Sequence, residues 1–172
     1  MWEVSAEIVN EMLQRIRPIQ TDLVLKEVLK ADFKADLPIE GGWGYSQMSP
    51  IKFLKQENSY LFVPMEYQIV QFLLYEELII FRKERDRHSG IEKNLIRQRM
   101  VKENGRRFDV LEFEIICWHD FYWNALKTEW EEAHNQPDAK EDILAMNERK
   151  KNESLLRFER VFFFDITDVY IF

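Results

Sequence analysis

The sequence has little of what redox and metal chemistry require. It contains one cysteine, Cys117, and three histidines, His88, His119 and His134. A single cysteine excludes a disulfide within the chain and is typical of a reducing compartment. The histidines stand far apart and show none of the spacings that metal sites use. We therefore predict no metal site and no cofactor.

Long apolar runs are also absent. No run approaches the roughly 20 apolar residues that cross a bilayer. The first residues, Met1-Trp2-Glu3, lack the basic and then apolar order of a signal peptide. The protein is therefore expected to be soluble and cytoplasmic, with no membrane partner.

Glycine is scarce, and three of the five glycines stand in one segment, Gly41-Gly42-Trp43-Gly44-Tyr45-Ser46. Their spacing matches neither a phosphate-binding loop nor a dinucleotide-binding fingerprint. We interpret the segment as a loop whose glycines adopt positive φ angles and which packs Trp43 and Tyr45 against a sheet. The alternative is a loop that binds a partner through these two aromatic rings.

The chain is rich in apolar and aromatic residues. Of its 172 residues, 46% are hydrophobic, thirteen are Phe and five are Trp. This length supports one well-buried core and is short for two, so we predict a single domain spanning residues 1–172. Large aromatic side chains are expected to fill much of that core.

A β-hairpin is the most clearly marked element. Asn104-Gly105 separates two alternating segments, and this dipeptide favours a type I′ turn, in which both central residues have positive φ. The predicted hairpin covers residues 94–118 and places Arg97 opposite Glu112. One face of the hairpin then belongs to the core and carries Ile96, Met100, Leu111, Phe113 and Ile115.

Helices are predicted on both sides of the hairpin in the sequence. Ser5 is expected to cap a first helix, and Thr21 a second helix over residues 22–29. After the hairpin, Asp120 is expected to cap the first of two helices that together cover residues 120–152. We expect these helices to pack against the sheet.

Further strands complete the predicted sheet. Residues 51–54 and 156–164 are expected to be strands, and Pro64 is well placed to begin a helix between them. That helix leads to residues 77–81, where two β-branched residues favour a strand, although a helix continuing to Phe81 fits the periodicity as well. The predicted fold is α+β, with an antiparallel sheet of about four or five strands packed by the N-terminal helices and the helix pair.

A catalytic cysteine is not predicted. Cys117 and His119 are two positions apart on a predicted strand, and such neighbours share a face but lie about 6–7 Å apart. That separation is too long for the imidazole to activate the thiol directly. Cys117 alternates inward with Phe113 and Ile115, so we expect a buried, unreactive thiol and predict no catalytic residue.

The net charge of −7 is unevenly distributed. Residues 82–107 carry ten Lys and Arg against four Asp and Glu, a balance of +6, which leaves −13 for the rest of the chain. We interpret this basic segment as a solvated edge with internal ion pairs, and the alternative is a contact to phosphate groups.

An acidic cluster follows later in the sequence. We interpret it as a solvated helix face, and the alternative is a surface for a basic partner. The cluster consists of Glu129, Glu131, Glu132, Asp138, Glu141 and Asp142.

Three segments carry a resemblance to a family. They are Gly41-Gly42-Trp43-Gly44-Tyr45-Ser46, Tyr75-Glu76-Glu77-Leu78-Ile79-Ile80-Phe81-Arg82 and Phe158-Glu159-Arg160-Val161-Phe162-Phe163-Phe164-Asp165-Ile166. With them the chain resembles small bacterial proteins of the toxin-immunity type over most of its length. The resemblance implies a protein that neutralises a toxin, and it assigns no role to a single residue.

These observations favour a non-enzymatic protein-binding module, in its most specific form a bacterial immunity protein that neutralises its cognate toxin by occlusion. The partner is expected to be a protein, such as a basic toxin domain, and the predicted contacts are Trp43, Tyr45, Glu129, Glu132, Asp138 and Asp142. One alternative is an enzyme or small-ligand-binding protein with a carboxylate-lined pocket that uses Glu76, Glu77 or His119. Another is nucleic-acid binding through residues 82–107.

Overall fold

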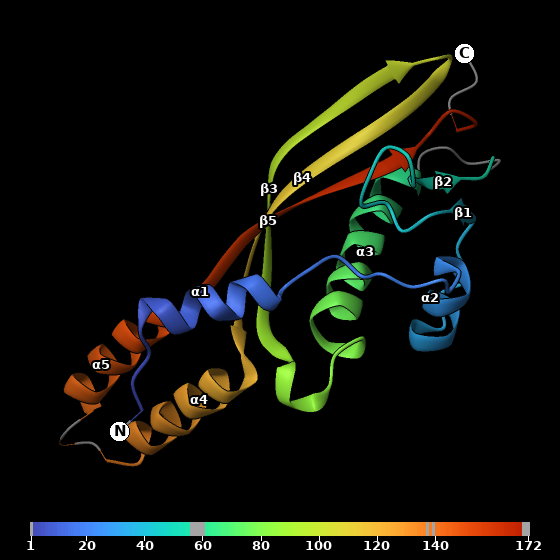
Figure 1. The fold of residues 1–172 in the computed structure, drawn as a ribbon. Helices are drawn as coiled ribbons and strands as arrows, with labels where there is room; N and C mark the ends of the chain where they lie inside the picture. Colours follow the sequence, from blue (N-terminus) through green and yellow to red (C-terminus); the bar gives the residue numbers. More distant parts are fainter. Residues whose placement is uncertain (1, 56–60, 137, 139, 170–172) are drawn as a thin grey trace. The chain divides into compact units, whose positions relative to one another are not determined.

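The computed structural model describes residues 2–55, 61–136, 138 and 140–169, and its fold is α+β. Figure 1 shows the elements in chain order, which are α1 (Ala6–Arg15), α2 (Leu25–Phe33), β1 (Ile39–Gly41), β2 (Ile51–Phe53), α3 (Phe62–Tyr75), the π-helix η2 (Glu76–Ile80), the 3₁₀ helix η3 (Glu84–Asp86), β3 (His88–Glu103), β4 (Arg106–His119), α4 (Asp120–His134), α5 (Lys140–Glu153) and β5 (Leu156–Asp165).

The strands form a five-stranded sheet in the order β1-β2-β5-β4-β3. β1 pairs antiparallel with β2, whereas β2 pairs parallel with β5, where Ile51 lies opposite Phe164. The predicted α+β class and number of strands are confirmed, and the parallel pair makes the sheet mixed. β3 stands last in the order and therefore forms an edge of the sheet.

Tertiary contacts divide the chain into two compact units. Unit 1 comprises Met1–Arg17, Glu76–Lys93 and Ile115–Phe158, and unit 2 comprises Pro18–Tyr75, Asn94–Glu114 and Glu159–Phe172. β3, β4 and β5 contribute residues to both units. The single domain expected for the whole chain stays a prediction.

Aromatic rings form the core of unit 2, as the composition predicts. Phe53 of β2 stacks on Phe164 of β5 with 5.7 Å between ring centroids, and Phe162 lies 6.3 Å from Phe113 of β4. All four side chains are fully buried. Since burying a large apolar side chain stabilises a fold by roughly 1.5–3 kcal/mol, these rings contribute a large part of the stability of this unit.

A tryptophan-rich cluster forms part of the core of unit 1. Trp118 and Leu126 are buried and pack against Trp2 and Trp123. α4 and α5 lie side by side (Figure 1), and the buried amide of Asn147 in α5 donates to the carbonyl of Leu126 in α4 at 2.9 Å. The predicted helix pair is thus present and is tied together by a buried polar contact.

The predicted turn of the hairpin is confirmed. Asn104 and Gly105 have φ angles of 51° and 75°, as a type I′ turn requires. The register that this turn sets brings Arg97 of β3 to Glu112 of β4, whose carboxylate accepts from the guanidinium at 2.9 Å. Both the turn and the register follow from the sequence.

The predicted core face is wrong for β3. Leu111, Phe113 and Ile115 of β4 are buried, but Ile96 and Met100 of β3 are 49% and 58% exposed. The alternation places these five residues on one face, but it does not reveal which strand is central. β4 lies between β5 and β3, whereas β3 has a strand neighbour on one side only among the described residues and is less completely covered.

The strand predicted at residues 77–81 is also wrong. The chain continues from α3 into the π-helix Glu76–Ile80, and the N–H of Phe81 donates to the carbonyl of Glu76 at 2.9 Å. Helical hydrogen bonds and the full burial of Leu78 outweigh the strand preference of two β-branched residues. The alternative of a continuing helix is therefore the correct one.

The predicted helix caps are confirmed at one of three sites. The hydroxyl of Ser5 accepts from the N–H of Ile8 at 3.2 Å and caps α1. Thr21 does not cap α2, because its hydroxyl accepts from a loop N–H and the helix begins later. The cap of α4 is His119 rather than Asp120, which is the first residue of that helix.

Candidate functional site

The glycine-rich loop of unit 2 buries its tryptophan. Gly41 and Gly44 have φ angles of 90° and 82°, so the positive φ predicted for this loop is confirmed. Trp43 is 8% exposed, and its indole N–H donates to a backbone carbonyl at 2.9 Å. Tyr45 is half-buried, with its ring 5.9 Å from that of Phe162. The loop packs both rings, so little of Trp43 is available to a partner.

The acidic residues predicted to bind a partner belong to unit 1. Glu132, Asp138 and Asp142 are exposed at the ends of α4 and α5. The carboxylate of Glu129 forms an ion pair with the ammonium group of Lys150 at 2.6 Å, and this contact links the two helices. Three of the four acidic residues are thus open to a partner, and the fourth supports the helix pair.

The predicted thiol environment is confirmed. Cys117 is fully buried, and this burial raises its pKa to about 12. The Nδ1 atom of His119 accepts from the N–H of Phe121 at 3.2 Å, which caps α4. A protonated thiol and an imidazole used as a helix cap do not form a nucleophile and its base.

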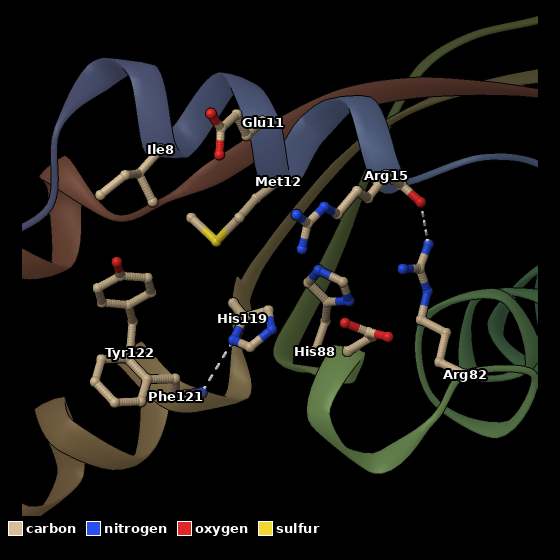
Figure 2. A pocket seen from close by; sticks show the side chains of 10 residues that line it. Ile8, Glu11, Met12, Arg15, Arg82, His88, His119, Phe121 and Tyr122 are labelled. Carbon is tan, nitrogen blue, oxygen red and sulfur yellow. Dashed lines mark hydrogen bonds between the residues drawn. The ribbon is translucent and has the colours of Figure 1, made fainter.

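A pocket in unit 1 has histidines at its base. Its volume is about 230 Å³. In Figure 2, α1 supplies Glu11, Met12 and Arg15 on one side, while His88 and His119 lie opposite them. The two imidazole rings are 5.5 Å apart and nearly perpendicular. The full lining comprises Ile8, Glu11, Met12, Arg15, Arg82, Asp86, His88, His119, Phe121 and Tyr122.

His88 is the buried titratable group of this pocket. It is 2% exposed, and its Nδ1 atom has no hydrogen-bond partner in the described part of the chain. Burial, and then the charges of Arg82 and His119, lower the pKa of His88 to about 4. The imidazole is therefore neutral at pH 7.

Arg82, a cationic residue of this pocket, is bound to backbone carbonyl groups. The guanidinium of Arg82 donates from Nε to the carbonyl of Glu77 at 2.8 Å and from Nη2 to the carbonyl of Arg15 at 3.0 Å (Figure 2 shows the second bond). Glu76 and Glu77, which were predicted to line a pocket, are buried within the π-helix. Of the three residues predicted for such a pocket, His119 is the one that lines this cavity.

A buried carboxyl pair lies in unit 2. Glu66 of α3 is fully buried, and Asp109 of β4 is 6% exposed. The Oδ2 atom of Asp109 accepts from Nε2 of Gln98 at 2.7 Å, and Oε1 of Gln98 accepts from the hydroxyl of Tyr67 at 3.0 Å. Neither carboxyl oxygen of Glu66 has an N–H or hydroxyl donor among the residues that the structure describes. The two carboxyl groups can therefore form a hydrogen bond with each other only if one of them is protonated.

The proton of this pair belongs to Glu66. Burial raises the pKa of Glu66 to about 10, and the charge of Asp109 and a hydrogen bond with it contribute further. Neither residue was among the predicted site residues. The spacing of Phe62, Glu66, Ile69 and Val70, however, places Glu66 on the buried face of α3, and this is the sequence signal that identifies it.

A second pocket opens beside this pair within unit 2. Its volume is about 400 Å³, within the range of small-molecule sites. Its lining contains Asp109 and the basic residues Arg99, Lys102 and Arg107. The remaining lining residues are Phe62, Val63, Gln98, Met100 and Ile166.

The edge strand β3 exposes apolar side chains on both of its faces. Leu95 is 44% exposed, and Ile96 and Met100 on the other face are exposed more. Exposed apolar edge strands are rare because they pair readily with other strands, and proteins usually blunt them with charges or cover them. Arg97, Arg99 and Lys102 supply such charges, but the three apolar side chains between them stay exposed.

Comparisons with models of protein families, with curated proteins and with solved structures gave no match. Within the described ranges of the chain, no helix combines the length and the apolar character that spanning a membrane requires. The same residues contain no group of three or more His, Cys, Asp and Glu side chains arranged to hold a metal ion.

Proposed function

We propose that this protein is a protein-binding module that takes an extended segment of its partner as an additional strand along β3. The observation that carries the proposal is the exposure of Leu95, Ile96 and Met100 on a strand at the edge of the sheet. Strand addition uses the free backbone groups of an edge for affinity and the side chains that flank it for specificity.

The length and the two exposed faces of β3 support this mode of binding. β3 has 16 residues, well above the five or six of an average strand. An added strand would cover Leu95 on one face and Ile96 and Met100 on the other, and it would remove apolar surface from water on both. A helix laid across the sheet would cover only one of these faces.

The charge of β3 indicates the composition of the partner segment. Arg97, Arg99 and Lys102 are exposed, and because Arg97 forms an ion pair with Glu112 of β4, Arg99 and Lys102 carry the positive charge of this edge. Acidic side chains on the partner segment would face this basic edge, which favours correct encounter and register. We therefore propose an extended segment with acidic residues on either side of an apolar centre.

The resemblance to toxin-immunity proteins suggests the biological form of this binding. In that form the partner is a toxin, and the protein neutralises it by occluding its active surface. The exposed carboxylates Glu132, Asp138 and Asp142 support a second contact, to a basic region of the toxin. No catalytic step is needed for this function.

Two lysine substitutions in unit 2 test the proposal. Ile96→Lys places a charge at the centre of the exposed edge, and Leu23→Lys places one on a leucine of unit 2 that is 58% exposed outside the sheet. Partners are captured from the source cells by the wild-type protein, identified, purified and titrated against each variant. We expect Ile96→Lys to weaken binding by about tenfold or more, because it charges an apolar contact, and Leu23→Lys to change it by less than about twofold. Equal affinities of the two variants would overturn the proposed edge.

A further inference from the structure

The pocket of unit 2 combines three chemical features in one space. Lys102 and Arg107 line it on the same face of the hairpin as Met100 and favour an anionic ligand. Phe62 and Met100 supply apolar surface. Asp109 supplies a carboxylate, and its neighbour Glu66 is protonated, so the carboxyl pair carries one negative charge against the two positive charges of Lys102 and Arg107.

The carboxylate of Asp109 is held in a fixed orientation. Gln98 donates to its Oδ2 atom at 2.7 Å, and the amide of Gln98 is itself oriented by the Tyr67 hydroxyl. The side chain is 6% exposed, so it cannot turn into solvent without losing these contacts. A positioned, mostly buried carboxylate at the wall of a pocket accepts hydrogen bonds from hydroxyl groups of a ligand.

The carboxyl pair is costly for the fold. Burying Glu66 against another carboxyl group forces it to take up a proton, which costs free energy at neutral pH. A glutamine or a leucine at this place in the buried face of α3 would avoid that cost. Strongly perturbed carboxyl groups beside a cavity are more typical of functional sites than of structural cores.

We propose that the pocket of unit 2 binds a hydroxylated phosphate monoester such as a sugar phosphate. The phosphate lies between Lys102 and Arg107, which the hairpin register places on the Met100 face, since a group with up to two negative charges matches two cations better than a carboxylate does. A hydroxyl group of the ligand donates to Asp109. The carbon skeleton of the ligand lies on Phe62 and Met100.

Three probes separate this two-point recognition from general attraction of anions. Ribose 5-phosphate carries both the phosphate and the hydroxyl groups, inorganic phosphate carries only the charge, and ribose carries only the hydroxyl groups. Each is titrated into the full-length protein while the backbone amide signals of Gln98, Lys102 and Asp109 are followed by NMR. We expect saturable binding of ribose 5-phosphate at least about tenfold tighter than binding of inorganic phosphate, and no saturation with ribose.

Two variants assign the two points of contact. Lys102→Gln is expected to weaken ribose 5-phosphate about tenfold, whereas Lys30→Gln, which removes the same charge from an exposed site on α2, is expected to leave it within about twofold. Asp109→Asn is expected to lower the preference for ribose 5-phosphate over inorganic phosphate. It weakens the acceptor for the hydroxyl group and at the same time removes a charge that repels phosphate.

The outcomes decide the proposal without reference to a protein partner. Equal affinity for ribose 5-phosphate and inorganic phosphate would show an unspecific basic surface and overturn it. Unchanged binding in Lys102→Gln would overturn it as well, and this exposed substitution does not depend on the carboxyl network for folding. Ribose binding as tightly as ribose 5-phosphate would exclude the phosphate contact.

Discussion

At the scale of single residues, two buried titratable groups oppose each other in their effect on stability. Glu66 in unit 2 has a raised pKa, and His88 in unit 1 has a lowered pKa. The sequence did not reveal either perturbation, because a pKa shift depends on burial and on neighbours from other elements. It did predict that Cys117 is buried, since that inference needs only the alternation along one strand.

Glu66 should make the protein less stable as the pH rises. Its pKa moves from an ordinary 4.5 to about 10 in the folded protein, so above pH 4.5 the folded state retains a proton that the unfolded chain releases. Stability then falls with pH up to about 10, by roughly 3 kcal/mol at pH 7. Glu66→Gln keeps a donor to Asp109 and removes this loss. Urea unfolding at pH 5, 7 and 9 should show a flatter dependence for the variant, and parallel curves would contradict the assignment.

His88 should produce the opposite trend on the acid side. Its pKa falls from 6.5 to about 4 in the folded protein, so the unfolded chain binds a proton first as the pH is lowered. The free energy of unfolding is therefore unaffected by this group above pH 6.5 and decreases progressively between pH 6.5 and pH 4. His88→Gln should reduce the loss of thermal stability between pH 7 and pH 5. A variant that loses as much stability as the wild type over this range would show that His88 is not the group responsible.

At the scale of elements, local signals predicted more than long-range ones. The turn at Asn104-Gly105 follows from two residues, and the pairing of Arg97 with Glu112 follows from that turn. The exposure of Ile96 does not follow from them, because it depends on the order of all five strands. The π-helix after α3 was missed because residue preferences are weak compared with tertiary packing.

The two glycine turns of unit 2 offer a matched pair of substitutions. Gly105 has a φ of 75° and open space where a Cβ atom would stand, so Gly105→Ala should cost only backbone strain, about 1 kcal/mol. Gly44 has a φ of 82°, and an added Cβ atom would lie 2.8 Å from Cδ1 of Ile51. Gly44→Ala should therefore destabilise the protein more than Gly105→Ala in denaturant unfolding. The reverse order would contradict the packing of the glycine-rich loop.

At the scale of the whole molecule, exposed charges of the two signs are found in different units of the chain. The acidic residues Glu132, Asp138 and Asp142 are exposed in unit 1, and the basic residues of β3 are exposed in unit 2. Charge counts predicted that such exposed charges exist, because charged side chains remain in water. They did not predict the carboxyl pair of unit 2, which joins residues far apart in the sequence and buries them together.

Neutralising the acidic surface should slow association with a basic partner. The triple variant Glu132→Gln, Asp138→Asn, Asp142→Asn should lower the association rate constant and flatten its dependence on salt, with little change in dissociation. The matched control, Glu27→Gln, Asp32→Asn, Asp36→Asn, removes three exposed charges from unit 2. Stopped-flow association at several salt concentrations compares the two. Similar effects of both variants would mean that net charge, and not this surface, governs encounter.

The availability of β3 for a partner strand is tested most directly by amide hydrogen exchange at single-residue resolution. A two-residue turn makes residues 103 and 106 a hydrogen-bonded pair, so the odd-numbered amides of 95–101 point toward β4 and the even-numbered ones point outward. We predict that in the free protein the amides of residues 96, 98 and 100 exchange fast while those of 95, 97 and 99 are protected, and that the partner slows exchange of the first set. Protection of both sets in the free protein, or an unchanged pattern in the complex, would contradict the account.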